Sequence, residues 1–194
     1  AARTPVGRFQ GGLAAIAAPR LGSIAIAEAV RRAGIAPDDV DEVIMGNVLA
    51  AGLGQAPARQ AALHAGLPVA VPATTINKMC GSGLKAVMLA QQAIACGDAA
   101  VVVAGGMENM SAAPYLLERA RTGYRLGDDR IIDVILRDGL MDAYREIHMG
   151  NCAEILAREH RISRTEQDDY AALSYRRAIS AMDEGRVADE VVPV

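Results

Sequence analysis

The sequence has no tryptophan and a single phenylalanine among its 194 residues. Hydrophobic residues still make up 52% of the chain, so the core must be built mainly from alanine and aliphatic side chains. Charged residues make up 22%, which is typical of a globular protein with one sizeable domain and room for part of another. The net charge of −3 argues against a nucleic-acid partner, and no apolar run is long enough to cross a membrane.

Cysteine is also scarce, and its three residues are Cys80, Cys96 and Cys152. An odd number at wide spacing argues against a disulfide framework and favours a reducing compartment, so we expect a cytoplasmic protein. The chain has no Cys-x-x-Cys and no His-Glu-x-x-His motif. His148 and Cys152 could share a helix face, but an isolated pair is a weak metal signal, and we expect no metal site. No signal peptide is visible.

The stretch around Cys80 carries the residues best suited to chemistry. A β-prone run at 73–77 leads into the cysteine, and Gly81 and Gly83 follow it. A helix to about Cys96 is predicted from apolar residues at helical spacing, namely Leu84, Val87, Met88 and Ile94. Cys80 is therefore expected at a helix N-terminus, where free N–H groups and the positive end of the dipole favour the nucleophilic thiolate. The glycines would let a substrate carbonyl reach both the sulfur and nearby amides.

A buried structural role is the usual alternative for an intracellular cysteine. We assign that role to Cys96, at the end of the predicted helix, and to Cys152, within a later helical pattern.

Strands and helices alternate through the first part of the chain. Ser23 is expected to cap a helix that runs to about residue 33, and a second helix is predicted at 57–65 with an alanine face at positions 58, 61, 62 and 65; each is ended by a glycine. Strands are predicted at 43–48, 73–77 and 99–104. The run 99–104 is apolar on both faces, which favours a central strand of a parallel sheet. Strand, helix and strand around Cys80 form a βαβ unit, so the fold class is α/β.

The composition changes after residue 110. Residues 115–145 combine glycines with many acidic and basic side chains and show no clean period, which indicates an excursion from the α/β core. Ser163 and Glu166 form a capping-box pattern before a helix that is expected to end at Gly185. We therefore divide the chain into an α/β core with the nucleophile at 1–110 and an incomplete loop domain at 111–194.

Residues 77–83, NKMCGSG, resemble the acyl-accepting cysteine motif of the thiolases, the acetyl-CoA C-acetyltransferases and 3-ketoacyl-CoA thiolases. Three further segments resemble thiolase segments in the family's order: ARTPVG at 2–7, AGGMENMS at 104–111 and HMG at 148–150. The resemblance covers essentially the whole chain. It implies a thiolase-like fold, with a mixed and largely parallel sheet, helices on both sides and part of a loop domain. Thiolases have two similar halves and a strand before the present start, so we expect a first half truncated at both ends.

The resemblance also implies an activity. Thiolases condense two acetyl-CoA molecules to acetoacetyl-CoA, or cleave a 3-ketoacyl-CoA with coenzyme A, and Cys80 would carry the acyl group. Leu140, His148 and Met149 match the segments that line the pantetheine and acyl pocket, although sequence alone would make them ordinary loop or packing residues. Coenzyme A thioesters are substrates here, so no cofactor is expected.

Two consequences concern the rest of a thiolase. The family's other catalytic groups, an asparagine, a histidine and a second cysteine, belong to the second half, so residues 1–194 alone are expected to be inactive. Thiolases assemble as homodimers or homotetramers, and we expect the same here. The basic cluster Arg119, Arg121, Arg125 and Arg130 is most often a solvated face; assembly is our preferred role for it, with steering of coenzyme A phosphates as the other.

Two other functions fit part of the pattern. Residues 81–86 match Gly-x-Gly-x-x-Ala between a strand and a helix, which is the outline of a dinucleotide-binding turn. That function needs an acidic residue at the end of the next strand, whereas Glu108 lies beyond a glycine turn, and Cys80 would have no role. A non-catalytic interaction domain on the same fold would differ from the enzyme in that Cys80 could not be acylated.

Overall fold

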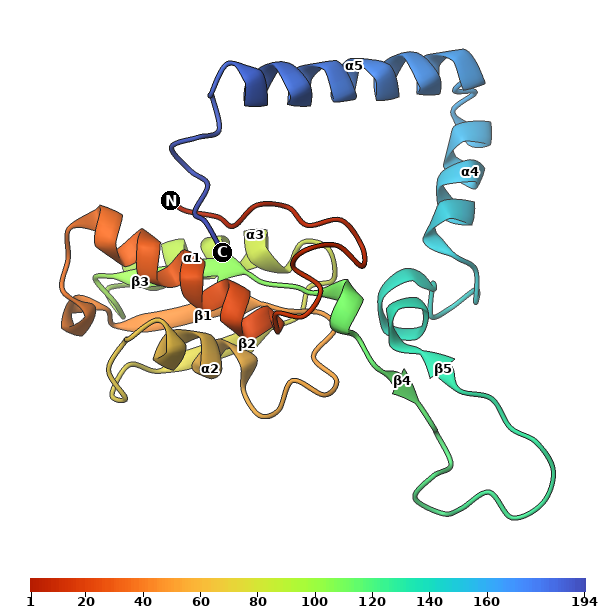
Figure 1. Cartoon of the computed structure of the whole chain (residues 1–194), viewed down its shortest axis with the longest axis horizontal. Coiled ribbons are helices and arrows are strands. Elements are labelled where there is room, and N and C mark those ends of the chain that lie inside the picture. The colour runs from red at the N-terminus through yellow and green to blue at the C-terminus, as the bar shows by residue number, and fades with distance from the viewer. The chain divides into compact units, whose positions relative to one another are not determined.

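A computed structural model describes residues 1–194. Contacts divide the chain into two compact units, one of Ala1–Gly139 with Val192–Val194 and one of Leu140–Val191 (Figure 1). The sequence suggested a division at residue 110, where the composition changes. The contacts instead keep residues 111–139 with the first unit, and a loop domain that begins at residue 111 stays a prediction.

A three-stranded parallel sheet forms the middle of the first unit. Its strands are β1 (Glu42–Gly46), β2 (Ala73–Ile76) and β3 (Val102–Gly106), in the order β2-β1-β3. Gly46 pairs with Ile76 on one side and with Gly106 on the other. The carboxyl ends of all three strands therefore meet at one edge of the sheet. The predicted α/β class with a largely parallel sheet is confirmed.

The prediction that the run 99–104 forms a central strand is wrong. β3 lies at an edge of the sheet, and its residues from Val102 to Gly105 are only half-buried. The central position belongs to β1, in which every residue from Val43 to Gly46 is buried. Apolar character on both faces shows that a strand is suited to burial, but the pairing order depends on partners far along the chain.

Helices cover both faces of this sheet. α1 (Ala18–Ala33) and α2 (Pro57–His64) pack on each other, and the core cluster on their side includes Val43 and Met45. The alternate strand residues, such as Gly46, face α3 (Ser82–Cys96), because side chains of a strand alternate between its faces. The alanine face predicted for α2 is confirmed, since Ala58, Ala61 and Ala62 are each at most 1% exposed.

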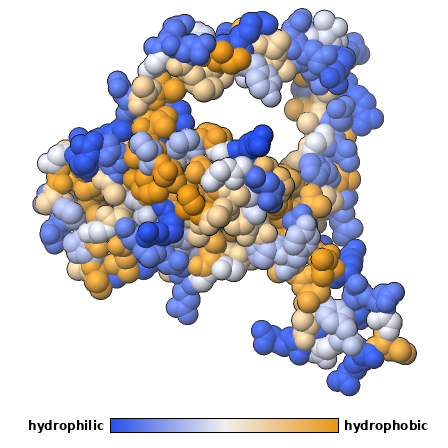
Figure 2. Space-filling view, in the orientation of Figure 1, coloured by the Kyte–Doolittle hydropathy of each residue, from blue (hydrophilic) through white to orange (hydrophobic).

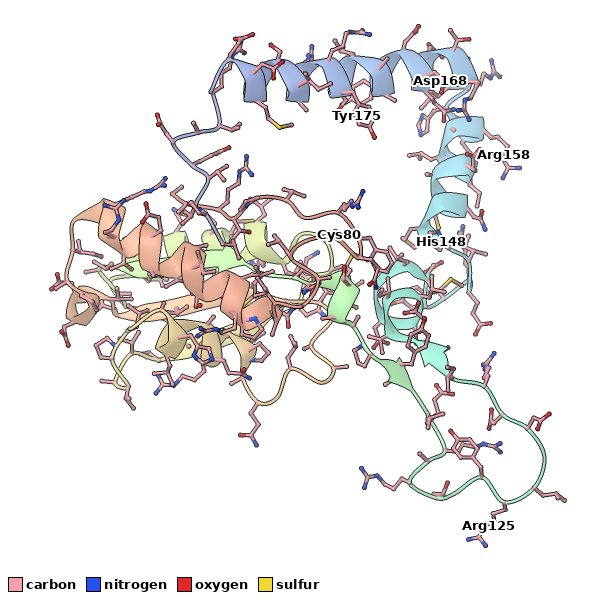
Figure 3. The ribbon with its side chains drawn as sticks, in the orientation of Figure 1. Cys80, Arg125, His148, Arg158, Asp168 and Tyr175 are labelled. Atoms are coloured by element: carbon pink, nitrogen blue, oxygen red, sulfur yellow. The ribbon has the colours of Figure 1, made fainter.

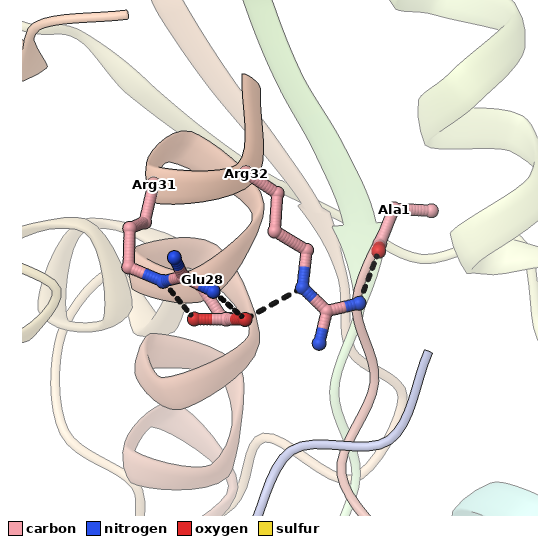
Figure 4. A network of polar contacts seen from close by, with 4 residues as sticks. All are labelled: Ala1, Glu28, Arg31 and Arg32. Carbon is pink, nitrogen blue, oxygen red and sulfur yellow. Dashed lines mark hydrogen bonds and ion pairs between the residues drawn. The ribbon is translucent and has the colours of Figure 1, made fainter. Parts of the chain in front are cut away.

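The start of α1 differs from the prediction. Ser23 was expected to cap the helix, but α1 begins at Ala18 with a proline in its first turn, and the Ser23 hydroxyl donates to the carbonyl of Arg20 at 2.7 Å. Its end at Gly34, which has a φ of 68°, is as predicted. Near this end the Glu28 carboxylate accepts hydrogen bonds from Arg31 and Arg32 (Figure 4).

α3 turns its small residues toward the sheet. Ser82, Ala86 and Ala90 are buried. The large residues of the predicted apolar face are instead between 47% and 70% exposed; they are Leu84, Val87, Met88 and Ile94. A helix that approaches strand ends closely needs small side chains at the contact, which explains why the small face is the one that packs.

The rest of the first unit leaves the sheet. After short 3-10 helices at Pro37–Asp39 and Met110–Ala112, β4 (Tyr115–Leu116) pairs antiparallel with β5 (Ile132–Asp133). The long loop between these two strands carries the basic cluster, with Arg125 near its tip (Figure 3). A π-helical turn, Ile135–Leu140, leads to the second unit.

The second unit consists mainly of two helices, α4 (Met149–Glu159) and α5 (Arg164–Asp183), and neither has a buried residue. Hydrophilic residues predominate along α5 (Figure 2). The predicted capping box is present, with Ser163 accepting from the amide of Glu166 and the Glu166 carboxylate accepting from the amide of Ser163. No helix is long and apolar enough to cross a membrane.

Candidate active site

Cys80 lies on the turn between β2 and α3, and its side chain is exposed (Figure 3). The helix begins at Ser82 with Gly81 as its N-cap residue, so Cys80 lies just before the helix N-terminus, as the sequence predicted. The preceding residue, Met79, has a φ of 50°, which is strained for a residue with a side chain. Strain of this kind, on the order of 1–3 kcal/mol, persists where the surrounding structure enforces it, and it marks this turn as a functional candidate.

Local hydrogen bonds enforce the conformation of the turn. The buried Ser82 hydroxyl donates to the carbonyl of Met79 at 2.6 Å and accepts from the amide of Lys78 at 2.8 Å. The side chain of Asn77 accepts from the amide of Met79 at 2.9 Å. A serine inside the helix and an asparagine after the strand thus hold the loop from both ends. Neither role is evident from the sequence alone, although both residues belong to the motif NKMCGSG.

The first turn of α3 provides unpaired amide donors beside this loop. The amide of Ser82 donates to Met79 and that of Lys85 donates to Gly81, whereas those of Gly83 and Leu84 bond to no atom of the chain. Free amides at a helix N-terminus carry partial positive charge and suit an anionic sulfur or oxygen. The turn can therefore present a thiol and donors for developing negative charge on one surface.

Close backbone contacts seat this helix turn on the ends of two strands. A Cβ atom added to Gly46 would lie 2.6 Å from the carbonyl carbon of Ser82 and 2.7 Å from the nitrogen of Gly83. A Cβ atom added to Gly106 would lie 3.2 Å from the Cα of Gly83. A side chain on Gly46 would displace the first turn of α3, and one on Gly106 would press against it, so both strand-end glycines have a packing role.

The predicted binding residues fall in the second unit, and the structure groups them there. Met141 forms an isolated antiparallel bridge with His148, which brings the residue after Leu140 beside the residue before Met149. His148 precedes α4 as its cap, and its Nδ1 accepts from the amide of Gly150 at 2.9 Å. In the neutral ring the other nitrogen, Nε2, then carries the proton and remains a donor.

The structure does not place the other two cysteines, or Glu108, in a second candidate site. Cys96 is exposed and Cys152 is half-exposed, so neither is the buried packing residue that was expected. No three His, Cys, Asp or Glu side chains are grouped for a metal ion. Glu108 is the acid nearest to the end of β3. Its carboxylate is not free to bind a ribose, because it accepts hydrogen bonds from the Asn47 side chain and from the backbone amides of Val48 and Leu49.

A strained strand-to-helix turn that exposes a cysteine beside free amides is suited to covalent acyl transfer. Comparison with known proteins gives the family. Residues 1–194 match the family described as "Thiolase, N-terminal domain", and the chain belongs to it.

Similar proteins include enzymes named acetyl-CoA acetyltransferase. Those of Cupriavidus necator and Pseudomonas aeruginosa are 57% and 55% identical over the whole of this chain, which covers 49% of each. The mitochondrial acetyl-CoA acetyltransferase A of Xenopus laevis is 57% identical, and the chain covers 46% of it. The chain thus spans about half the length of the curated relatives that it matches.

Proposed function

We propose that the natural full-length protein transfers acyl groups between thioesters of coenzyme A, with the acyl group carried on Cys80. The observation that carries the proposal is the exposed Cys80 thiol on the turn before α3, within a motif that resembles the acyl-accepting motif of thiolases. Family membership supports the reaction type, and the names of the relatives support acetyl-CoA as the acyl donor.

The first half-reaction follows from the geometry of the turn. The Cys80 thiolate attacks the thioester carbonyl, the carbonyl electrons move onto oxygen, and amides at the start of α3 donate to that oxygen. Collapse of the tetrahedral intermediate expels the thiolate of coenzyme A, which takes up a proton, and leaves an acyl-cysteine. In residues 1–194 the Cys80 side chain is exposed, so its sulfur is open to a thioester carbonyl there.

The second half-reaction is either condensation with another acetyl-CoA or, in reverse, cleavage of a 3-ketoacyl-CoA by coenzyme A. Both directions need a group that exchanges a proton with the α-carbon of acetyl-CoA: it removes the proton in condensation and returns it in cleavage. The resemblance implies that this group belongs to the second half of a thiolase. We therefore propose that residues 1–194 alone accept an acetyl group slowly and stoichiometrically but do not turn over. Loss of a general base typically lowers a rate by about 10²–10⁴-fold.

Substrate contacts and assembly complete the proposal. Leu140, His148 and Met149 are proposed to contact the pantetheine and acyl groups, with His148 Nε2–H as a donor. The protein is proposed to act as a homodimer or homotetramer, to which the β4–β5 loop contributes, and to work in the cytoplasm. Coenzyme A thioesters are its substrates, and no cofactor is proposed.

The test is incubation with acetyl-CoA, an acid quench and peptide mass spectrometry. We expect an acetyl group on Cys80, none in Cys80→Ser, and an unchanged yield in the control Cys96→Ser. Acetylation confined to other residues would contradict the proposal. Tight NAD binding without coenzyme A binding would support the dinucleotide alternative, and a folded protein without either ligand would support an interaction domain.

A further inference from the structure

We propose that Glu108 and Asn47 are positioning residues for Cys80, because they tie together the strand ends on which the Cys80 turn is seated. Neither side chain belongs to the acyl-accepting motif, and neither is assigned to the reaction above. The inference rests on the proposed function only for its turnover measurement, since the reactivity of Cys80 can be followed without any acyl transfer.

The carboxylate of Glu108 joins the segment after β3 to the segment after β1. Its Oε1 accepts from Asn47 Nδ2 at 2.7 Å and from the amide of Leu49 at 3.2 Å, and its Oε2 accepts from the amide of Val48 at 2.8 Å. Three N–H donors from consecutive residues thus converge on one side chain that is half-buried. An ionised carboxylate accepts at both oxygens, whereas glutamine would turn an NH2 group toward at least one of these donors.

Asn47 accepts only one orientation in this set of contacts, which we call the Glu108–Asn47 junction. It is only 2% exposed, and its Nδ2 also donates to the carbonyl of Met107 at 3.2 Å. A flipped amide would place oxygen against two acceptors, so the orientation of the side chain is fixed by its partners. Its Oδ1 is buried without a partner, an expensive arrangement that the two bonds from Nδ2 offset.

The residues of the Glu108–Asn47 junction lie close in sequence to the glycines that contact the turn. Asn47 follows Gly46, whose Cα faces Ser82 and Gly83, and the amide of Met107 donates to the carbonyl of Gly46 at 2.9 Å. Gly106, one residue before Met107, touches Gly83 from the other strand. Glu108 and Asn47 therefore fix the spacing of the two glycines that support the first turn of α3, and Cys80 lies two residues before the start of that helix.

Loosening the junction is expected to move Cys80 relative to the free amides of α3. A misplacement of about 1 Å at a reacting group can lower a rate on the order of 10²-fold. We therefore expect Glu108→Gln to reduce acetylation of Cys80 and kcat by roughly 10- to 100-fold while KM stays within about twofold, because the substrate contacts are untouched.

The matched control is Glu42→Gln. Glu42 lies at the start of β1, at the end of the strand away from Asn47, and its carboxylate accepts a long hydrogen bond of 3.4 Å from the Thr74 hydroxyl. Both variants are made in the natural full-length protein, and the thermal unfolding midpoint is recorded for each. Alkylation by iodoacetamide is measured at Cys80 and Cys96 in the same sample. A general loosening of the fold would leave the alkylation rate of Cys80 unchanged or would raise the rates of both Cys80 and Cys96. Loss of positioning lowers the alkylation rate of Cys80 alone.

A second pair of variants covers the case in which Glu108→Gln does not fold. Gly106→Ala places a Cβ atom 3.2 Å from the Cα of Gly83 and disturbs the same contact directly, whereas the Cβ atom of Gly105→Ala meets only the Met45 side chain, at ordinary distances of 3.5 and 3.7 Å. We expect slower alkylation of Cys80 in Gly106→Ala and none of that change in Gly105→Ala. Equal Cys80 alkylation within either folded pair would overturn the inference. Because alkylation needs no coenzyme A, the result decides the inference even if acetyl transfer is absent.

Discussion

The N-terminal turn of α3 packs closely against Gly46 at the end of β1, and this contact gives a specific prediction for Gly46→Ala. The new methyl group would lie 2.6 Å from backbone and side-chain carbons of Ser82 and 2.7 Å from the nitrogen of Gly83. Carbon atoms in contact are normally about 3.5–4.0 Å apart, so the helix turn or the strand must move by roughly 1 Å. Neither neighbour is a flexible side-chain end that could simply rotate away.

The expected loss of stability is about 1–3 kcal/mol, the usual range for overpacking a well-packed site. The same movement displaces Cys80, so acetylation should fall on the order of 10²-fold if the shift of about 1 Å reaches the sulfur. Stability is measured by urea unfolding of the natural protein, with a lower midpoint at an unchanged slope as the expected signature. Cys80 acetylation is followed in parallel by mass spectrometry.

Gly105→Ala is the control, because its methyl group meets the Met45 sulfur at 3.5 Å and no positive φ opposes it. Its stability should stay within about 0.5 kcal/mol of the parent, as for substitutions that break no special contact. If Gly46→Ala matches Gly105→Ala in both stability and acetylation, the helix does not approach β1 as described, and the argument for the glycine seat is wrong.

Two further predictions concern charge and helix capping. Hydrogen bonds from Arg31 and then Arg32 hold the pKa of Glu28 at about 2, below its ordinary 4.5, so its stabilising effect is complete above pH 4.5 and is lost as the pH falls toward 2. The free energy of unfolding should therefore fall more steeply with acid across that window in the parent than in Glu28→Gln, and equal slopes would contradict the assignment. Ser163→Ala removes the acceptor for the Glu166 amide and should destabilise the start of α5 by about 0.5–2 kcal/mol, seen as faster hydrogen exchange in its first turn. Ser174→Ala, in the exposed middle of the same helix, should leave that exchange unchanged.

Much of the fold follows from local pattern. The glycine at position 34, the alanines of α2 and the capping box at Ser163 each act within a few residues, so the sequence predicts them and the structure confirms them. The same holds for the turn at Cys80, where a strand, two glycines and a helix follow in order. Errors appear where neighbours are distant along the chain: β3 lies at an edge of the sheet, and α3 packs through its alanines rather than its larger residues.

The parts of the candidate site that sequence could not supply are the ones that depend on pairing order. Glu108 and Asn47 are 61 positions apart, and nothing local distinguishes either from a surface residue after a strand. They meet only because β1 lies between β2 and β3, which brings the segment after β3 beside the segment after β1. The same order places Gly46 and Gly106 under the first turn of α3. Cys80 can thus be proposed as the nucleophile from its own motif, whereas the residues proposed to position it become visible only once the order of the strands is known.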